Sequence, residues 1–564
     1  MLHAHEIAYH WFGNLITPLW WDDLWLNESF ATFMEAKFSN MLEPDWRFDV
    51  DIIKNSHQAM LLDRAKSVHS VHQEVSSTDG ISAAFDDITY QKGADILAML
   101  ENSLGEKEFQ SFVQELLVTQ AFGSITSDNF TKSLQLRKNG SAIAKIFPSY
   151  IENSGLPMAR ITKQNATVQL SQSLCQMDGF ENEFLDQKIW YIPVCMSSLD
   201  NQNQDCQILS SHSKLLENSL LATAPSVTVD DVPRYYVFNV DRHDWLNILD
   251  AVPKMPKARA LAVAISYDIA FLQDQVSLKD YLSGIEQIAS HPDWEVAGFP
   301  IERLDFILSG TPPSSPFFES IRNKAVKIYH IKLTAIGLKK SFAGKNIHSS
   351  LLEIERADLV DLFVANNLDS NVENHLADLG EKISQSGNVP LDDNDLVPHD
   401  VVEAALMAAA KRDGERFLHQ TLTKLGHSSD AYEREIWLRA IAASTAPSAG
   451  IEIERLLLSD ILRNQEVPVL LFARAAIPEF RDQIWDVVDR HPKALLARLD
   501  GDFDITLIQI ADGFVTEPQA RRVKKTIAPL LGQLRGGAIQ LKQTLEHIRS
   551  HEFFLRRLTK QFAG

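Results

Sequence analysis

The chain has 564 residues, and 54 Lys and Arg residues against 75 Asp and Glu residues give it a formal net charge of −21. This length predicts roughly two to four domains with ample buried core. The negative charge argues against nucleic acids and anionic membrane surfaces as partners. No apolar run reaches the length of a membrane span and no signal peptide opens the sequence, so we expect no transmembrane segment and favour a cytoplasmic location.

The first ten residues hold part of a metal-binding pattern. His5 and Glu6 begin an H-E-x-x-H arrangement, in which two histidines on one helix face bind zinc and the glutamate activates a water. The position four after His5 is Tyr9, and a histidine follows at His10. Five residues turn about 140° around a helix, so His5 and His10 can share one ion only across a π-bulge. His3 falls on the opposite side of the helix and is not expected to take part.

The first quarter of the chain has helical periodicity. A first helix should end at Gly13–Asn14, which form a suitable C-terminal cap, and a second should run over residues 23–38. Glu28 and Glu35 are seven residues apart and therefore share a face of the second helix. A further helix should begin near Tyr90, where apolar residues recur at helical spacing.

The three cysteines, Cys175, Cys195 and Cys206, are few, odd in number and clustered in the sequence. Disulfide frameworks are typical of short secreted chains with an even number of cysteines. We therefore predict free, buried thiols and no disulfide framework.

The pattern changes to short alternating strands near residue 156 and returns to helix near residue 251. Strands are predicted at Thr167–Leu170 and Tyr235–Phe238. Beyond them, amphipathic helices such as residues 258–272, 401–411 and 540–548 are broken by Pro, Gly and Asp. Sustained short helices without strands favour an α-solenoid of stacked helix pairs.

Two blocks of this sequence resemble the gluzincin zinc aminopeptidases, the aminopeptidase N-like family. The first block comprises Trp11–Asn14 and Trp20–Thr32, with eighteen residues between Tyr9 and Glu28, and the second is Phe85–Ala94. The family reads H-E-[IL]-A-H-Q-W-F-G-N and then, eighteen residues after the second histidine, N-E-[GS]-F-A. Aligned without a gap, Tyr9 falls on the family's second zinc histidine and His10 on the following glutamine.

The resemblance continues, more weakly, to the end of the chain. Trp190–Val194 and Arg234–Asn239 are similar to strand markers of the family's small β domain. The implied fold is mainly α with a small β-sandwich. Its implied domains are the helical part of a thermolysin-like catalytic domain (1–155), a small β-sandwich domain (156–250) and a C-terminal helical, HEAT/armadillo-like superhelical domain, an α-solenoid (251–564).

The resemblance also implies a site. His5 and Glu28 would bind one Zn²⁺ per chain, with Tyr9 in place of the family's second histidine ligand. Glu6 would be the general base, Tyr90 would donate a hydrogen bond to the oxyanion, and Glu35 would hold a ligand imidazole.

The implied activity is zinc-dependent removal of N-terminal amino acids from peptides, so the expected partners are peptides with a free N-terminus. A phenol is a poor replacement for an imidazole ligand because its ordinary pKa is near 10. We therefore expect activity to be impaired or lost. The alternative is a catalytically inactive remnant, a pseudoenzyme that serves as a peptide- or protein-binding module.

A second expectation concerns what precedes the first helix. In the family, a β domain and a G-x-M-E-N segment that anchors the substrate's amino group come before the zinc helix, and this sequence begins at that helix. We therefore expect a truncated product, a misplaced gene start or half of a split gene, with the missing N-terminal half as a separate chain. Such a chain would expose an apolar face where the missing sheet packs.

Overall fold

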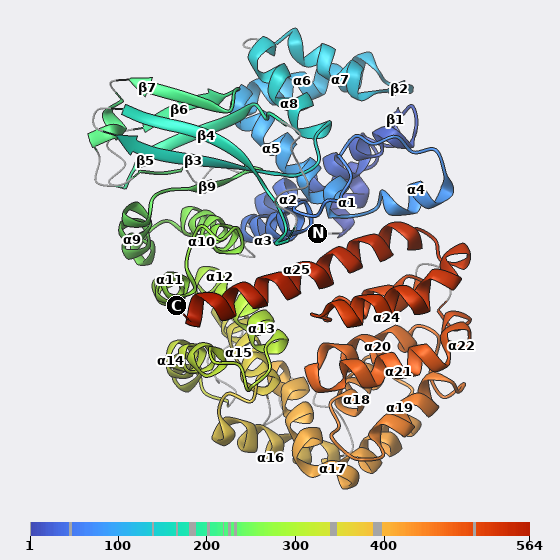
Figure 1. The fold of residues 1–564 in the computed structure, drawn as a ribbon. Helices are drawn as coiled ribbons and strands as arrows, with labels where there is room; N and C mark the ends of the chain where they lie inside the picture. Colours follow the sequence, from blue (N-terminus) through green and yellow to red (C-terminus); the bar gives the residue numbers. More distant parts are fainter. Residues whose placement is uncertain are drawn as a thin grey trace. The chain divides into compact units, whose positions relative to one another are not determined.

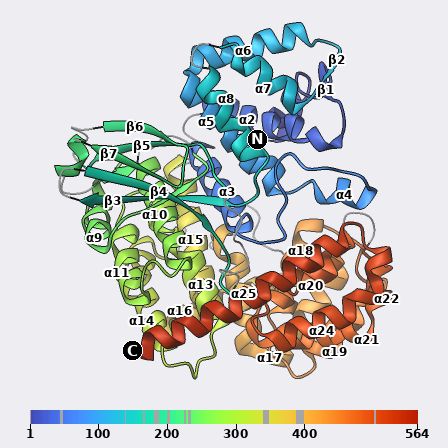
Figure 2. The same ribbon diagram turned by 45° about the horizontal axis from the view of Figure 1, so that its top comes forward.

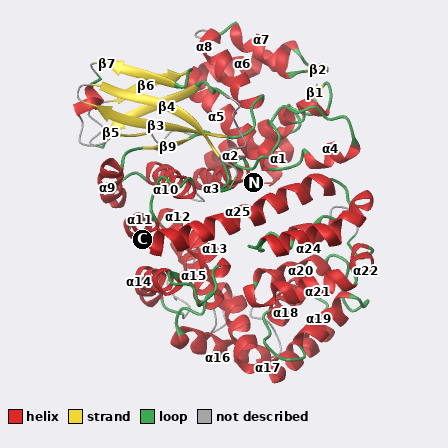
Figure 3. Ribbon diagram, viewed as in Figure 1, coloured by secondary structure: helices red, strands yellow, loops and turns green. Residues whose placement is uncertain are grey.

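The computed structural model describes residues 2–563 except 44–47, 138–139, 165–166, 180–187, 200–203, 218, 224–226, 230–233, 339–346, 387–397 and 500–502. The chain forms two compact units, Met1–Phe299 and Pro300–Gly564. Helices predominate in both (Figure 3), which confirms the mainly α fold class. None of the described helices is long and apolar enough to cross a membrane.

Helices make up both ends of the first unit (Figure 1). Their bounds are α1 (Leu2–Ala8), η1 (Trp21–Asp23), α2 (Trp25–Leu42), α3 (Phe48–Leu62), α4 (Thr78–Ala83), η3 (Ile88–Lys92), α5 (Gly93–Leu104), α6 (Glu106–Thr119), α7 (Ser127–Gln135), α8 (Gly140–Ile151), η4 (Leu220–Thr223), α9 (Arg242–Ala251), η5 (Val252–Lys254), α10 (Lys257–Leu272), α11 (Leu278–Ala289) and α12 (Trp294–Ala297).

Most strands of the first unit lie between Leu156 and Asn239, and two short ones precede them. The strands are β1 (Ile16–Pro18), β2 (Gly123–Ile125), β3 (Leu156–Gln164), β4 (Thr167–Cys175), β5 (Ile192–Ser198), β6 (Gln204–Leu209), β7 (Ser213–Glu217), β8 (Val227–Val229) and β9 (Val237–Asn239). The strand orders are β7-β4-β3-β9 and β6-β5-β8, with a separate parallel pair β1-β2. Strands β3 and β4 form the longest ladder, antiparallel from Leu156↔Cys175 to Gln164↔Thr167. The predicted strand at Thr167–Leu170 is therefore confirmed, whereas Tyr235 and Tyr236 precede β9.

The prediction of free thiols was wrong for two of the three cysteines. Cys195 on β5 and Cys206 on β6 are direct partners in an antiparallel ladder, with their Cα atoms 4.0 Å apart, and they form a disulfide. Sequence spacing does not reveal which residues a strand pair places opposite one another, so their count and clustering were misleading. Cys175 is a free, buried thiol as predicted.

An aromatic core holds the first helices together. The Trp25 ring of α2 contacts Phe130 of α7 and Phe147 of α8, with ring centroids 5.9 and 5.3 Å apart. Phe30, five residues further along α2, stacks on Phe12 with ring centroids 3.8 Å apart. The Trp25 indole is buried and donates to Ser127 Oγ at 2.9 Å, so its polar end is satisfied. Helix α2 is thereby fixed in position, because its buried face is rich in large aromatic side chains.

The predicted end of the first helix was wrong. Helix α1 ends at Ala8, and Tyr9 and His10 lie in a turn that follows it. Gly13 has φ 145° and allows the Tyr9 ring to pack over it, since a Cβ there would lie 2.7 Å from Tyr9 Cδ1. This local contact is found in place of the helix cap expected at Gly13–Asn14. The helix predicted near Tyr90 is confirmed, although its first turn, η3, is a π-helix.

A buried ion pair joins three parts of the first unit. Lys92 Nζ of η3 donates to Asp63 Oδ2 at 2.8 Å, and neither side chain has exposed surface. Asp63 Oδ1 also accepts from Gly155 N at 2.7 Å, next to the start of β3. Lys92 Nζ further donates to Asn153 O at 3.0 Å. The carboxylate therefore connects the chain after α3, the turn that carries Tyr90 and the first strand of the larger sheet.

Lys92→Met should lower the free energy of unfolding by about 3–5 kcal/mol, because it leaves the Asp63 carboxylate buried without its counter-charge. Urea denaturation followed by circular dichroism measures the loss. The double variant Asp63→Asn/Lys92→Met should lose clearly less than the sum of the single variants, since neither charge then remains buried alone. Additive losses would contradict the coupling.

Helix α2 approaches the first turn of α5 closely. Ser29 Oγ donates to Thr89 O at 2.7 Å, and Ser29 also faces Gly93. A Cβ built on Gly93 would overlap Ser29 Oγ and lie 2.7 Å from Ser29 Cβ. Glycine at position 93 therefore sets the separation between α2 and the helix that follows Tyr90.

Gly93→Ala should destabilise the protein by about 2–3 kcal/mol, because the added methyl group forces α2 and α5 apart. The midpoint of urea denaturation reports the change. Gly80→Ala is the matched control in the same unit, since its Cβ would meet Ser77 Oγ at 3.4 Å and Val75 Cγ1 at 3.6 Å, which are ordinary contact distances. Equal effects of the two substitutions would show that the close approach at Gly93 is unimportant.

Helices are the only regular elements among the described residues of the second unit. Its elements are α13 (Pro300–Gly310), α14 (Phe318–Ile336), α15 (Ile347–Ala365), α16 (Ser370–Ser386), η6 (His399–Val401), α17 (Val402–His427), α18 (Ala431–Ala442), α19 (Ala449–Leu457), α20 (Glu466–Ala476), η7 (Pro478–Phe480), α21 (Arg481–Arg490), α22 (Pro492–Leu496), α23 (Thr506–Gln509), α24 (Glu517–Ile527), η9 (Ala528–Gln533) and α25 (Gly537–Ala563). Successive helices pack on one another from α16 through α18, α20 and α21, and α25 lies along α24 (Figure 2).

A half-buried histidine on α25 is held in its neutral form. The His551 ring packs edge-on against Phe306 with centroids 4.6 Å apart, and its Nδ1 lies 3.4 Å from Phe514 O. Burial, followed by the neighbouring His547, lowers the pKa of His551 to about 3. Protonation therefore opposes folding here, because the unfolded chain binds this proton near pH 6.5 and the folded unit does not.

The second unit should lose stability as the pH falls from about 6.5 towards 3, by roughly 2 kcal/mol at pH 5 from His551 alone. Urea denaturation at pH 7 and pH 5 measures this loss. In His551→Gln the difference between the two pH values should shrink, whereas the exposed His419→Gln should leave it unchanged. An unaltered difference in His551→Gln would contradict the assignment.

Candidate functional site

His5 lies between two carboxylates of α2. His5 Nδ1 is 3.0 Å from Glu35 Oε2, and His5 Nε2 is 3.6 Å from Glu28 Oε2. His5 and Glu28 are buried and Glu35 is half-buried. Hydrogen bonding to Glu28 and then to Glu35 raises the pKa of His5 to about 9, although burial lowers it. The seven-residue spacing of the two glutamates therefore places both on the face of α2 that meets α1.

Two phenols close the site around Glu28. The Tyr9 ring centroid is 5.4 Å from that of His5, and the Tyr90 ring is 6.0 Å from it. Burial first, and then hydrogen bonding to and repulsion by Glu28, raises the pKa of Tyr9 well above its usual value. Burial and Glu28 raise the pKa of Tyr90 in the same way. Both side chains can therefore donate a hydrogen bond at neutral pH.

The other two histidines and the glutamate of the first ten residues are all exposed. Glu6 is exposed on α1, and its charge acts on both Tyr9 and Tyr90. His10 is exposed in the turn after α1, where its Nδ1 accepts from Asn14 Nδ2 at 3.3 Å. His3 is also exposed. The structure thus gathers His5, Glu6, Tyr9, Glu28, Glu35 and Tyr90, and leaves His3 and His10 outside the cluster.

One positioning feature was missed in the sequence. Asp86 Oδ1 accepts from the backbone N–H groups of Ile88 and Thr89 at 3.0 and 3.2 Å, and Asp86 Oδ2 lies 2.9 Å from His69 Nε2. Asp86 therefore caps the turn that carries Tyr90 while His69 holds its other oxygen. An aspartate two residues before a helix start could have revealed the cap, but nothing in the sequence links it to His69.

The donor set does not fit a complete zinc site. Structural and catalytic zinc is held by three or four Cys, His, Asp or Glu side chains. In the parts of the chain that the structure describes, no group of three such residues could hold a metal ion. His5 and Glu28 supply two donors, with His5 Nε2 facing Glu28 while Glu35 engages Nδ1. The third neighbour is the phenol of Tyr9, a different donor type.

Comparison with known proteins identifies two family domains. Residues 1–150 match the Peptidase family M1 domain, and residues 230–550, more than half of the chain, match the ERAP1-like C-terminal domain. Among curated proteins, the chain is 26% identical over 555 residues to Tricorn protease-interacting factor F2 of Thermoplasma acidophilum, covering 98% of this chain and 63% of that protein.

Two named aminopeptidases match over shorter stretches. Leucyl aminopeptidase of Saccharolobus solfataricus is 36% identical over 194 residues, which cover 34% of this chain and 24% of that protein. Aminopeptidase N of Canis lupus familiaris is 27% identical over 354 residues, which cover 58% of this chain and 36% of that protein. The chain spans less than two thirds of the length of each of these relatives. It belongs to peptidase family M1, the aminopeptidase N-like gluzincins.

Proposed function

We propose that this chain is a metallopeptidase-family protein that binds the N-terminal end of peptides and cleaves them slowly, because its zinc site lacks one normal ligand. The observation that carries the proposal is the cluster of His5, Glu28 and Glu35 with Tyr9 beside it. His5 and Glu28, which are zinc ligands of the usual type, face each other there. The side chain at the third ligand position is the phenol of Tyr9. Loss of one of three protein ligands should weaken zinc binding by orders of magnitude.

The other residues of the cluster suit peptide hydrolysis. Glu35 fixes the tautomer and orientation of the His5 ring, as carboxylates do for metal-binding histidines. The neutral Tyr90 phenol would donate a hydrogen bond to the oxyanion that forms at the scissile carbonyl. Glu6, exposed beside both phenols, would take the proton of the attacking water. These roles follow from the resemblance. They are supported by the 3.0 Å contact of Glu35 with His5, the 6.0 Å separation of the Tyr90 and His5 rings, and the effect of the Glu6 charge on Tyr90.

The domain plan is part of the proposal. Residues 1–155 would be the helical part of a thermolysin-like catalytic domain, residues 156–250 a β-sandwich, and residues 251–564 an α-solenoid. The strands between Leu156 and Asn239 and the stacked helices beyond residue 300 support this division. One relative's name, Tricorn protease-interacting factor, favours peptides as substrates and leaves a protein partner open.

A binding module without catalysis is the second candidate. It is favoured by the same Tyr9, whose packing over Gly13 and contact with Glu28 hold the phenol in place without a metal ion. In that case peptides would bind near the cluster and dissociate without being cleaved.

Tyr9→His should restore the ligand set and raise both zinc content and peptidase activity by at least tenfold. Zinc per chain is measured by mass spectrometry after dialysis, and activity by hydrolysis of aminoacyl-coumarin. His10→Gln is the matched control and should change neither, because His10 lies outside the cluster. In the Tyr9→His background, Glu6→Gln should keep the zinc and abolish turnover.

Different outcomes separate the candidates. One tightly held zinc per chain with bestatin-sensitive turnover in the unmodified protein would overturn the proposed impairment. Zinc binding by Tyr9→His without any turnover would favour the binding module. If Tyr9→His gains no zinc, position 9 does not limit metal binding.

A further inference from the structure

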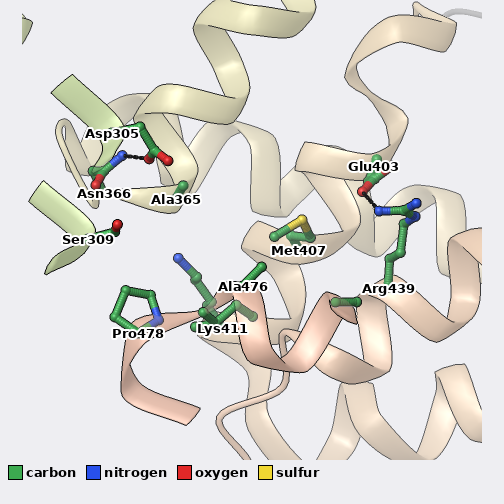
Figure 4. Close-up of a pocket in the computed structure, with 12 residues that line it drawn as sticks. Asp305, Ser309, Ala365, Asn366, Glu403, Met407, Lys411, Arg439, Ala476 and Pro478 are labelled. Atoms are coloured by element: carbon green, nitrogen blue, oxygen red, sulfur yellow. Dashed lines mark hydrogen bonds and ion pairs between the residues drawn. The ribbon is translucent and has the colours of Figure 1, made fainter. Parts of the chain in front are cut away.

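A cavity of about 200 Å³ lies within the second unit, between α13, α15, α17, α18 and the chain that ends α20 (Figure 4). For comparison, a protein cavity of about 150 Å³ accepts benzene. The space therefore suits a small molecule only somewhat larger than a benzene ring. Four charged side chains line it, and they are Asp305, Glu403, Lys411 and Arg439.

Two of these charges neutralise one another. Arg439 Nη1 lies 3.4 Å from Glu403 Oε1, and Arg439 Nη2 lies 2.8 Å from Glu435 Oε1. Figure 4 shows the Glu403–Arg439 pair on one side of the cavity, and the amine of Lys411 extending towards the side that carries Asp305 and Ser309. An acid and an amine therefore remain for a ligand.

Asp305 has one oxygen available. Asn366 Nδ2 donates to Asp305 Oδ1 at 2.6 Å, and among the described residues Oδ2 receives no hydrogen bond. Burial raises the pKa of Asp305, although Asn366 and the more distant Arg481 partly oppose this effect. A ligand ammonium at Oδ2 would relieve the cost of holding this carboxylate charged.

Lys411 is the basic counterpart of Asp305 in the wall of the cavity. Its Nζ donates to Val364 O at 2.6 Å and reaches Asn367 Oδ1 at 3.5 Å. In the part of the chain that the structure describes, no carboxylate lies within ion-pair distance of Nζ, and burial lowers the pKa of Lys411 despite longer-range attraction by Glu479 and Glu373. An ammonium has three N–H donors, so one remains for a ligand carboxylate.

The rest of the wall is apolar or uncharged. Its apolar members are Ala365, Met407, Ala473, Ala476, Ile477 and Pro478. A wall of small and aliphatic side chains favours an aliphatic group on the ligand.

A ligand with a single charge fits less well. A simple anion at Lys411 would be repelled by the Asp305 carboxylate, which lines the same side of the cavity. A simple cation at Asp305 would leave the ammonium of Lys411 uncompensated. A ligand that carries both charges satisfies both groups and adds no net charge.

We propose that this cavity is a binding site for a free aliphatic amino acid, with its ammonium at Asp305, its carboxylate at Lys411 and its side chain against the apolar wall. The inference goes beyond the proposed peptidase function and does not rest on it, because every lining residue belongs to the second unit.

The full chain is titrated with L-leucine by isothermal calorimetry. We expect saturable binding of one leucine per chain at the cavity. Leucine amide, which lacks the carboxylate, and N-acetyl-leucine, which lacks the ammonium, should each bind at least tenfold more weakly. This comparison uses the unmodified protein and does not depend on the folding of any variant.

Asp305→Asn and Lys411→Met should each weaken leucine binding at least tenfold. Asp460→Asn and Lys542→Met remove the same charges from exposed positions of the same unit and should leave binding unchanged. Circular dichroism melts verify that each variant is folded.

Leucine could also bind at the His5–Glu28 cluster as a product of cleavage, so Glu28→Gln is titrated in parallel. Binding that survives Glu28→Gln and fails in Asp305→Asn supports the cavity, whether or not the chain is a peptidase. Binding lost only in Glu28→Gln, equal affinity for leucine and its two analogues, or absence of saturable binding would overturn the inference.

Discussion

A lysine with no exposed surface must find its counter-charge inside the protein, and Lys92 finds it in Asp63. That carboxylate also receives the backbone N–H of Gly155, so one charged group holds a helix end, a π-turn and the entry to a sheet. Tyr90 lies two residues before Lys92, in the same turn. The position of the Tyr90 phenol relative to Glu28 therefore depends on a charge pair outside the cluster, together with the Ser29–Gly93 approach that sets the distance to α2.

The parts of the site that were predictable are those governed by helix periodicity. Glu28 and Glu35 could be placed on one face because seven residues complete two helical turns, and His5 meets both. The end of α1 could not be predicted, because it depends on the Tyr9 ring packing over Gly13. The partnership of Asp86 with His69 was equally hidden, since the two residues are seventeen positions apart in a segment without regular periodicity. The strand content of the middle region was visible in its alternation, but not the pairing of Cys195 with Cys206.

Tyr9 has a structural as well as a chemical effect. Its ring packs over Gly13, and its phenol is hydrogen-bonded to Glu28. A histidine at this position would be shorter and would leave part of the space above Gly13 empty, so the turn after α1 is adapted to tyrosine by packing. Tyr9 is therefore well accommodated beside the two carboxylates, His5 and Tyr90.

The disulfide between β5 and β6 has a consequence for strand pairing. A sheet whose ladder slips by one residue turns every side chain to the opposite face, and ordinary hydrogen bonds resist such a slip only collectively. Because Cys195 and Cys206 are direct partners, their bond fixes the alignment of the two strands covalently. The buried side chains of β5, including Val194 and Met196, consequently keep their inward orientation even when the ladder opens at its ends.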